Sequence, residues 1–296
     1  MKKRIFTGCA TALVTPFNDD CSVNYPRFRQ LVEEQIAGGV DALVVCGTTG
    51  ESATLDNEEH IRVISEAVSV SSGRVPIIAG TGSNDTMYAA QLSQHAESLG
   101  VDGLLMVTPY YNKTSQNGLI DHYFYVADRV KTPIILYNVP SRTGTAIKPE
   151  TYKELSKHEN IVAIKEANGD ISAIAKTMSL CAGELDLYSG NDDQIVPIMS
   201  LGGIGVISVL SNIMPKETHT ICAEYLKGNT TTARDMQLKY VSLINALFSD
   251  VNPIPVKEAM NMMGLGMGPL RMPLAPMTES AREALRGELK KHGLIK

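Results

Sequence analysis

The chain has 296 residues, of which 44% are hydrophobic, so it is long enough to bury one large core. Its formal charge of −5 and its scattered Lys and Arg residues argue against a nucleic-acid partner, and no apolar run approaches the roughly 18 residues that a membrane span needs. Five cysteines without a Cys-x-x-Cys pair indicate reduced thiols, as in the cytoplasm, and neither a disulfide framework nor a zinc site.

Short apolar runs alternate along the chain with segments that have helical spacing. The run at 11–14 precedes a helical pattern over 25–37, and the run at 42–46 precedes one over 57–70. A short continuous apolar run is typical of a strand that is buried on both faces of a parallel sheet. By the same criteria we expect further strands at 75–79, 103–107, 133–137, 161–165, 185–189 and 205–209, and further helices near 86–99 and 118–130.

The eight expected strands predict a closed (β/α)8 barrel, because they recur every roughly 20 to 33 residues with helical stretches between most of them. An open doubly wound sheet is the alternative. Its Gly-x-Gly-x-x-Gly fingerprint is missing, since the glycine clusters at 80–82 and 202–205 do not have that spacing. We expect residues 1–228 to form the barrel. Residues 229–296 are expected to form a C-terminal helical domain, from helical patterns at 231–248, 255–263 and 279–291.

One lysine, Lys165, stands at the end of the expected strand at 161–165. An amine at the mouth of an apolar core is desolvated, so its pKa falls and its neutral, nucleophilic form becomes more abundant. Imine formation with a ketone requires that form. The alternative is that Lys165 extends to solvent and pairs with Glu166, and the segment taken alone favours this second interpretation.

Unusual segments follow other expected strands, and in a barrel these segments meet at the same end. After the second strand, the turn Gly47-Thr48-Thr49-Gly50 offers hydroxyl and N–H groups that can hold a carboxylate. A helix-capping turn is an equally good interpretation of that segment. The segment 189–193 after the seventh strand, a glycine turn followed by helix-capping acids, is a weak signal.

Two further loops contain tyrosines. Neighbouring side chains of an extended chain point in opposite directions, so of Tyr110 and Tyr111 we expect one to face the cavity and the other a partner. Tyr137 and Arg142 follow the fifth strand, and Arg142 is suited to bidentate binding of a substrate carboxylate. The alternative interpretation, in which Tyr137 is a core residue and Arg142 a surface residue, remains open. The six histidines have no His-Glu-x-x-His spacing, so we expect neither a metal site nor a cofactor.

Together and in this order, these motifs resemble the pyruvate-dependent class I aldolases of the dihydrodipicolinate synthase and N-acetylneuraminate lyase superfamily, over essentially the whole chain. The motifs are the segments 47–51, 137–140 and 164–166. Within the superfamily, the pair Thr48 and Thr49 and the segment 141–144, which contains Arg142, resemble the dihydrodipicolinate synthases. The alternatives are an aldolase for a sugar acid, such as N-acetylneuraminate or 2-keto-3-deoxygluconate, and a barrel without catalytic activity that serves as a binding or scaffold protein.

The resemblance implies that Lys165 forms an imine with pyruvate, which then condenses with L-aspartate 4-semialdehyde to give 4-hydroxy-tetrahydrodipicolinate, on the route to diaminopimelate and lysine. It also implies a proton relay of Tyr137, Thr48 and Tyr111, with Tyr111 donated by a neighbouring subunit. The active protein is then expected to be a homodimer or a homotetramer. Glu166 would point away from Lys165, into the barrel wall or the helix layer.

The resemblance also implies two carboxylate sites. Thr48 and Thr49, with the main chain near Gly190 and Ile207, would hold the carboxylate of pyruvate. Arg142 would bind the carboxylate of the semialdehyde. Both assignments agree with the need for fixed hydrogen-bond donors around an anionic substrate.

Members of this superfamily that lysine inhibits have an allosteric cleft at a dimer interface. His60, Asn84 and Tyr110 match that cleft, but Asn57 stands where a histidine is common and Tyr88 where a glutamate is common. Without that carboxylate, the ammonium groups of lysine lose a partner. We therefore expect inhibition by lysine to be weak or absent.

Overall fold

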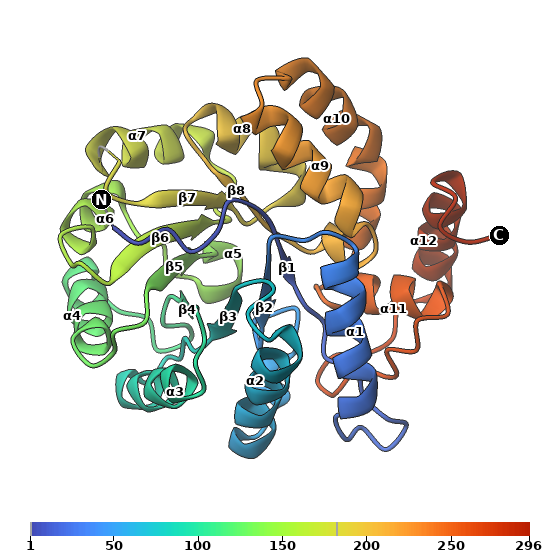
Figure 1. Ribbon diagram of the computed structural model, residues 1–296, viewed down its shortest axis with the longest axis horizontal. Helices are drawn as coiled ribbons and strands as arrows, with labels where there is room; N and C mark the ends of the chain where they lie inside the picture. The colour runs from blue at the N-terminus through green and yellow to red at the C-terminus, as the bar shows by residue number, and fades with distance from the viewer. Residues whose placement is uncertain (1, 182) are drawn as a thin grey trace.

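Within residues 2–181 and 183–296, which the computed structural model describes, eight parallel strands form a closed barrel (Figure 1). Each strand pairs with its neighbours in sequence, and β8 returns to pair with β1. The strands are β1 (Gly8–Ala12), β2 (Ala42–Val45), β3 (Ile77–Gly80), β4 (Gly103–Val107), β5 (Ile134–Asn138), β6 (Ile161–Glu166), β7 (Asp186–Ser189) and β8 (Gly205–Ser208). The predicted (β/α)8 barrel is confirmed.

Helices surround the barrel (Figure 1). They are α1 (Tyr25–Ala37), α2 (Asn57–Ser71), α3 (Thr86–Ser98), α4 (Gln116–Ala127), α5 (Pro140–Thr143), α6 (Pro149–Leu155), α7 (Ile171–Cys181), α8 (Ile195–Ser200) and α9 (Pro215–Leu226), with 3-10 turns η1 (Ser52–Thr54), η2 (Asp192–Gln194) and η3 (Leu210–Asn212). The helices α10 (Thr230–Leu247), α11 (Ile254–Met262) and α12 (Glu279–Lys291) follow. Figure 1 shows α10 beside α9, with α12 at the periphery. None of the described helices is long and apolar enough to cross a membrane.

The first strand was predicted with the wrong bounds. The apolar run suggested 11–14, whereas β1 spans Gly8–Ala12. The barrel closes through this strand, because Gly8 to Thr11 pair with Gly205 to Ser208 of β8. Pairing with a strand almost 200 residues away therefore sets where β1 begins. Leu13 and Val14 remain buried after the strand ends, as part of the core.

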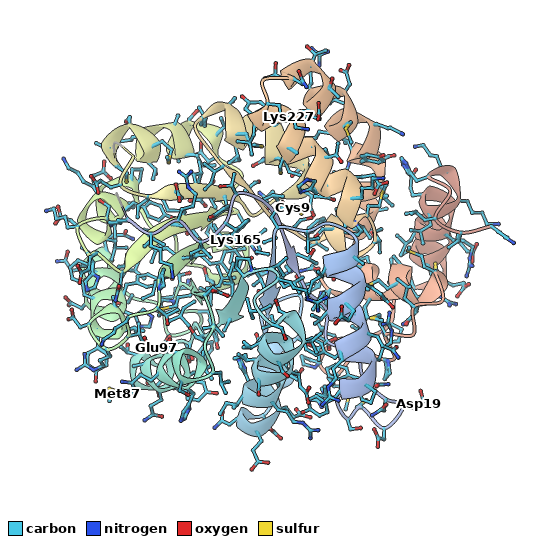
Figure 2. All side chains as sticks on the ribbon, in the orientation of Figure 1. Cys9, Asp19, Met87, Glu97, Lys165 and Lys227 are labelled. Carbon is cyan, nitrogen blue, oxygen red and sulfur yellow. The ribbon has the colours of Figure 1, made fainter. Side chains whose placement is uncertain are left out.

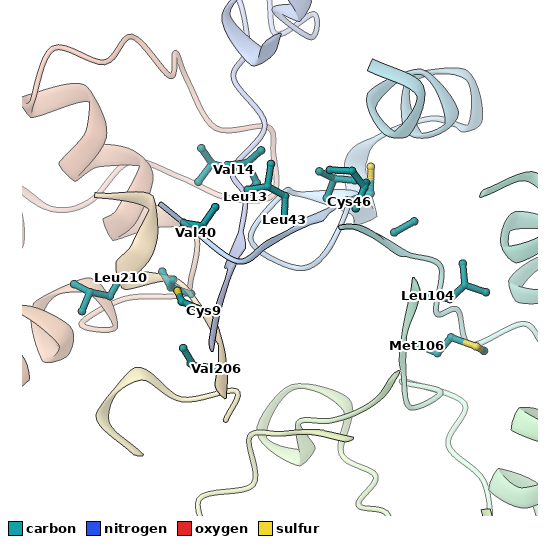
Figure 3. Close-up of a cluster of buried hydrophobic side chains, with 14 of the residues drawn as sticks. Cys9, Leu13, Val14, Val40, Leu43, Cys46, Leu104, Met106, Val206 and Leu210 are labelled. Carbon is teal, nitrogen blue, oxygen red and sulfur yellow. The ribbon is translucent and has the colours of Figure 1, made fainter. Parts of the chain in front are cut away.

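The core has two layers, because successive side chains of a strand point to opposite faces. Small and branched side chains fill the barrel interior: Ala10, Ala12, Ala42, Val44, Ile78, Leu105, Ile135, Ala163 and Ile207. The second layer lies between the barrel and its helices, and Figure 3 shows part of it, including Cys9, Leu43, Leu104, Met106 and Val206. Cys9 is wholly buried there, as expected for a core filler.

Barrel closure depends on two glycines. A Cβ atom at Gly205 would lie 1.9 Å from the carbonyl oxygen of Gly8, which is far inside van der Waals contact. Gly8 itself has φ of +108°, a conformation that L side chains rarely adopt. The β1–β8 seam therefore excludes a side chain at either position.

We expect Gly205→Ala to destabilise the protein by about 3 kcal/mol or more, because either the β1–β8 seam must open or the backbone must shift. Urea denaturation followed by circular dichroism measures this. Gly287→Ala is the matched control, since nothing lies within 4 Å of a Cβ there in α12. It should be neutral or stabilising by up to about 1 kcal/mol. Equal stability of Gly205→Ala and the parent would contradict the role of the seam.

Candidate active site

Lys165 lies inside the barrel, near the carboxyl end of β6, with only 6% of its surface exposed. Figure 2 shows it among the central strands, whereas Lys227 lies at the edge of the molecule. Burial lowers the pKa of Lys165 to about 8; the Asp192 carboxylate raises that pKa, and the Arg142 guanidinium lowers it. The interpretation of Lys165 as an exposed lysine paired with Glu166 is wrong, because Lys165 is buried and Glu166 bonds elsewhere.

Glu166 points out of the barrel toward the helix layer, as expected. Its carboxylate accepts hydrogen bonds from Nδ2 of Asn138 at 3.0 Å, from the Tyr152 hydroxyl of α6 at 2.9 Å and from the N–H of Asn168 at 3.0 Å. Burial raises its pKa to about 7, although these donors oppose the rise. Glu166 therefore leaves the amine of Lys165 without an ion-pair partner on its own strand.

Tyr137 lies directly beside Lys165, because the two residues pair across β5 and β6. The Lys165 Nζ atom is 4.2 Å from the centroid of the Tyr137 ring. Burial raises the pKa of Tyr137, while the Arg142 guanidinium and the nearby Thr48 side chain oppose that rise. The phenol is therefore protonated at neutral pH and can exchange a proton with a group bound to Lys165.

The turn after β2 brings Thr48 and Thr49 to the same end of the barrel. Gly50 and Glu51 donate their N–H groups back to Gly47 and Thr48, both at 3.1 Å, which closes the turn. Across the described residues, the N–H groups of Thr48 and Thr49 donate no hydrogen bond. Two neighbouring free amides of this kind make a binding site for an anion.

A cavity of about 460 Å³ opens beside this turn. Thr48 and Arg142 lie on its wall, together with Tyr110 and His60. Arg142 belongs to α5, and its Nη2 donates to the carbonyl oxygen of Asn252 at 3.0 Å. Lys165 does not line this cavity, because it lies within the barrel next to Tyr137. Thr48 connects the cavity to the barrel interior, since it lines the cavity and its side chain also contacts Tyr137.

The structure brings Lys165, Tyr137 and Thr48 together but leaves Tyr111 apart. Tyr111 is 91% exposed, has φ of +70° and does not line the cavity. The N–H of Gly190 is already used, since it donates to the Glu166 carbonyl oxygen at 2.7 Å. The remaining predicted position, Ile207, is fully buried in the barrel interior.

Two residues of the expected allosteric cleft, His60 and Tyr110, line the same cavity, and Asn84 directly follows the lining residue Ser83. His60 contacts the Gly80 carbonyl oxygen through Nε2 at 2.9 Å, and burial lowers its pKa. The backbone oxygen of Asn84 accepts a hydrogen bond from Asn112. Tyr88, which also lines the cavity, donates its hydroxyl to Oδ1 of Asn57. The two positions that depart from the regulated pattern therefore bond to each other.

Sequence reasoning missed Asp192, which it treated as a helix-capping acid. The side chain is 2% exposed, and its Oδ2 accepts the N–H groups of Val209 and Leu210 at 3.0 and 2.8 Å. Its Oδ1 has no partner among the described residues. Asp192 is the acid that raises the pKa of Lys165. No local pattern could reveal this, because the donors come from the loop after another strand.

Sequence reasoning also missed the contribution of the C-terminal helices. Asn252 donates through Nδ2 to Oγ1 of Thr49 at 3.0 Å, and Lys257 donates to Oε1 of Glu51 at 2.7 Å. Both contacts join segments that are more than 200 residues apart. Among the described residues, no cluster of three or more His, Cys, Asp or Glu side chains is arranged to hold a metal ion.

Comparison with known proteins gives a consistent result. A model of the dihydrodipicolinate synthetase family matches residues 5–292. The 4-hydroxy-tetrahydrodipicolinate synthase of Acetivibrio thermocellus is 51% identical over 295 residues, which cover 100% of both chains, and that of Caldicellulosiruptor bescii is 54% identical over 290 residues, 98% of both. The solved dihydrodipicolinate synthase of Acinetobacter baumannii, complexed with pyruvate, is 43% identical, with a TM-score of 0.96 over 98% of this chain and 99% of that one. The chain belongs to the dihydrodipicolinate synthetase family.

Proposed function

We propose that the chain is a lyase that condenses pyruvate with L-aspartate 4-semialdehyde to give 4-hydroxy-tetrahydrodipicolinate, in the biosynthesis of diaminopimelate and lysine. The observation that carries the proposal is the buried amine of Lys165 beside the phenol of Tyr137. The relatives named 4-hydroxy-tetrahydrodipicolinate synthase favour this reaction over that of a sugar-acid aldolase.

The reaction begins at Lys165. Its neutral amine attacks the ketone carbon of pyruvate, and the carbinolamine loses water to give an imine. Tyr137 donates a proton to the leaving oxygen, and Thr48 links the phenol to the cavity. Loss of a proton from the methyl group gives an enamine, whose terminal carbon forms the new bond with the aldehyde carbon. The product then leaves Lys165 when the amino group of the semialdehyde portion attacks the imine carbon and closes the ring.

The two carboxylates of the substrates bind at separate positions. The free N–H groups of Thr48 and Thr49 hold the carboxylate of pyruvate, without the N–H of Gly190, which already donates to the carbonyl oxygen of Glu166. Arg142 lies on the cavity wall, where a guanidinium can bind the carboxylate of the semialdehyde in bidentate fashion. This separation directs the aldehyde carbon toward the enamine.

The complete site needs a second subunit. A tyrosine in the left-handed region is strained by about 1 kcal/mol or more, and Tyr111 combines that strain with 91% exposure. We infer that Tyr111 enters the site of a neighbouring copy and completes the relay with Tyr137 and Thr48. The active form is then a homodimer, or a homotetramer of two such dimers. The five free cysteines support a cytoplasmic location. In this proposal the barrel comprises residues 1–228, and the C-terminal helical domain comprises residues 229–296.

Incubation with pyruvate and borohydride should give a stable adduct on Lys165, and Lys165→Met should give none. Because the pKa of Lys165 is lowered to about 8, the neutral fraction of the amine falls about tenfold for each pH unit below that value. The rate of trapping should therefore rise with pH and level off above about pH 8. Mass spectrometry locates the adduct, and an adduct on another lysine would contradict the assignment.

Arg142→Ala should lower kcat/KM for the semialdehyde about 100-fold, because a charge-assisted bidentate contact is lost. Trapping of pyruvate on Lys165 should change less than about threefold, since Arg142 does not hold that substrate. Arg142→Lys, which keeps the charge but not the bidentate geometry, is the matched control. Its kcat/KM for the semialdehyde should lie between those of the parent and Arg142→Ala. Equal losses in both assays would point to the sugar-acid alternative or to general damage.

Lysine should inhibit weakly or not at all, because Tyr88 offers no carboxylate to an ammonium group and instead bonds to Asn57. In a steady-state coupled assay, Tyr88→Glu should strengthen inhibition about tenfold or more by supplying that charge. Tyr88→Phe removes only the hydroxyl and serves as the control. Micromolar inhibition of the unmodified protein would show that this expectation is wrong.

A further inference from the structure

Glu51 has an unusual conformation directly after the threonine turn. Its φ of +55° lies in the left-handed region, although the residue is not glycine. Its side chain is buried, and the residue is 4% exposed overall. Thr48 and Thr49, whose N–H groups are free, precede it by only three and two positions, respectively. Whatever holds Glu51 therefore also constrains those two N–H groups.

Both carboxylate oxygens of Glu51 are held by the C-terminal segment. Oε1 accepts from Nζ of Lys257 in α11 at 2.7 Å, and Oε2 accepts from the N–H of Arg271 at 3.0 Å. The Lys257 side chain is 1% exposed, and its ammonium lies 3.9 Å from the centroid of the Phe17 ring. The ion pair is therefore sealed from water and fixed on several sides.

An ion pair this deeply buried adds little net stability. Desolvation of two charges consumes most of their attraction, and apolar residues of the same size often serve a fold equally well. The left-handed conformation of Glu51 adds backbone strain. Two features that do not stabilise the fold thus occur together at one residue, next to the anion-binding turn. Such a combination is typical of a functional site.

The C-terminal segment also contacts both carboxylate positions through Asn252. Its Nδ2 donates to Oγ1 of Thr49 at 3.0 Å, and its carbonyl oxygen accepts from Arg142 at 3.0 Å. Lys257 follows it in the same segment, with α11 in direct contact with η3 of the barrel. The appendage therefore forms part of the site, although none of its residues reacts.

We propose that Glu51 and Lys257 are positioning residues that hold the turn 47–51 in the conformation in which the N–H groups of Thr48 and Thr49 bind the carboxylate of pyruvate. The proposal rests on the proposed function, which identifies that anion. Without the pair, the turn relaxes toward an unstrained conformation and the two N–H groups separate from the anion. Pyruvate binding should weaken, whereas the semialdehyde subsite at Arg142 should stay as it is.

The test compares Lys257→Met, Glu51→Gln and the double variant in the full-length protein. Each apparent Kd for pyruvate comes from the concentration dependence of borohydride trapping on Lys165. We expect that Kd to rise about tenfold or more in all three variants. KM for the semialdehyde and kcat at saturating pyruvate should stay within about threefold. This split between substrates is a readout that a general loss of stability would not produce.

The double variant separates positioning from folding, because it leaves no buried charge unpaired. It should regain the urea midpoint of the parent and keep the weakened pyruvate binding. Glu59→Gln is the matched control, since it breaks the ion pair of Arg271 with α2 but leaves the carboxylate of Glu51 in place. Its Kd for pyruvate should not change.

An unchanged Kd for pyruvate in the folded double variant would overturn the proposal. Parallel loss of kcat and of both KM values would do the same, since it would mean that the pair only supports the fold. Failure of the unmodified protein to form an adduct with pyruvate would instead refute the proposed function. The two failures are therefore distinguishable.

Discussion

The desolvation of one amine is the constraint on which the rest of this site depends. The interior of the barrel is lined by small apolar side chains, and it holds Lys165 where charging its amine is unfavourable. The carboxylate of the next residue, Glu166, accepts hydrogen bonds from Asn138 and Tyr152, so it does not stabilise the charged form of the Lys165 amine. Asp192 moderates the effect, because its buried carboxylate raises the pKa of Lys165. The outcome is an amine that is partly neutral near pH 8 and remains next to the Tyr137 phenol.

The barrel architecture arranges the other groups around that amine. Parallel strands present their carboxyl ends at one side, so the loops after β2, β5 and β7 meet although they are distant in sequence. Each loop contributes a different chemical group: free N–H groups at Thr48, a guanidinium at Arg142 and a carboxylate at Asp192. Rigid strands fix the reacting groups, and the loops determine what binds.

The segment after Gly228 contacts the candidate site as well as packing against the barrel. The loop before α11 supplies Asn252 to Thr49, and α11 supplies Lys257 to Glu51, so this segment contacts the turn after β2. Buried polar contacts of this kind specify one geometry rather than adding much stability. They hold Glu51, a non-glycine residue with positive φ, beside the turn that we propose binds the carboxylate of pyruvate. On this proposal, the C-terminal segment limits how far the turn relaxes when no substrate is bound.

The sequence by itself determined the eight-strand rhythm and the residues that the barrel gathers at one end, Lys165, Tyr137 and Thr48. Apolar periodicity is local, and the closed topology brings these strand ends together without further information. Tertiary structure alone decided where β1 begins, since Gly8 must pair with Gly205, and that Lys165 is buried rather than exposed. It also decided the partners of Asp192, and that Glu51 pairs with Lys257 across 206 residues. The physical reason is that burial and side-chain pairing depend on what the rest of the chain packs against each residue, which no short segment encodes.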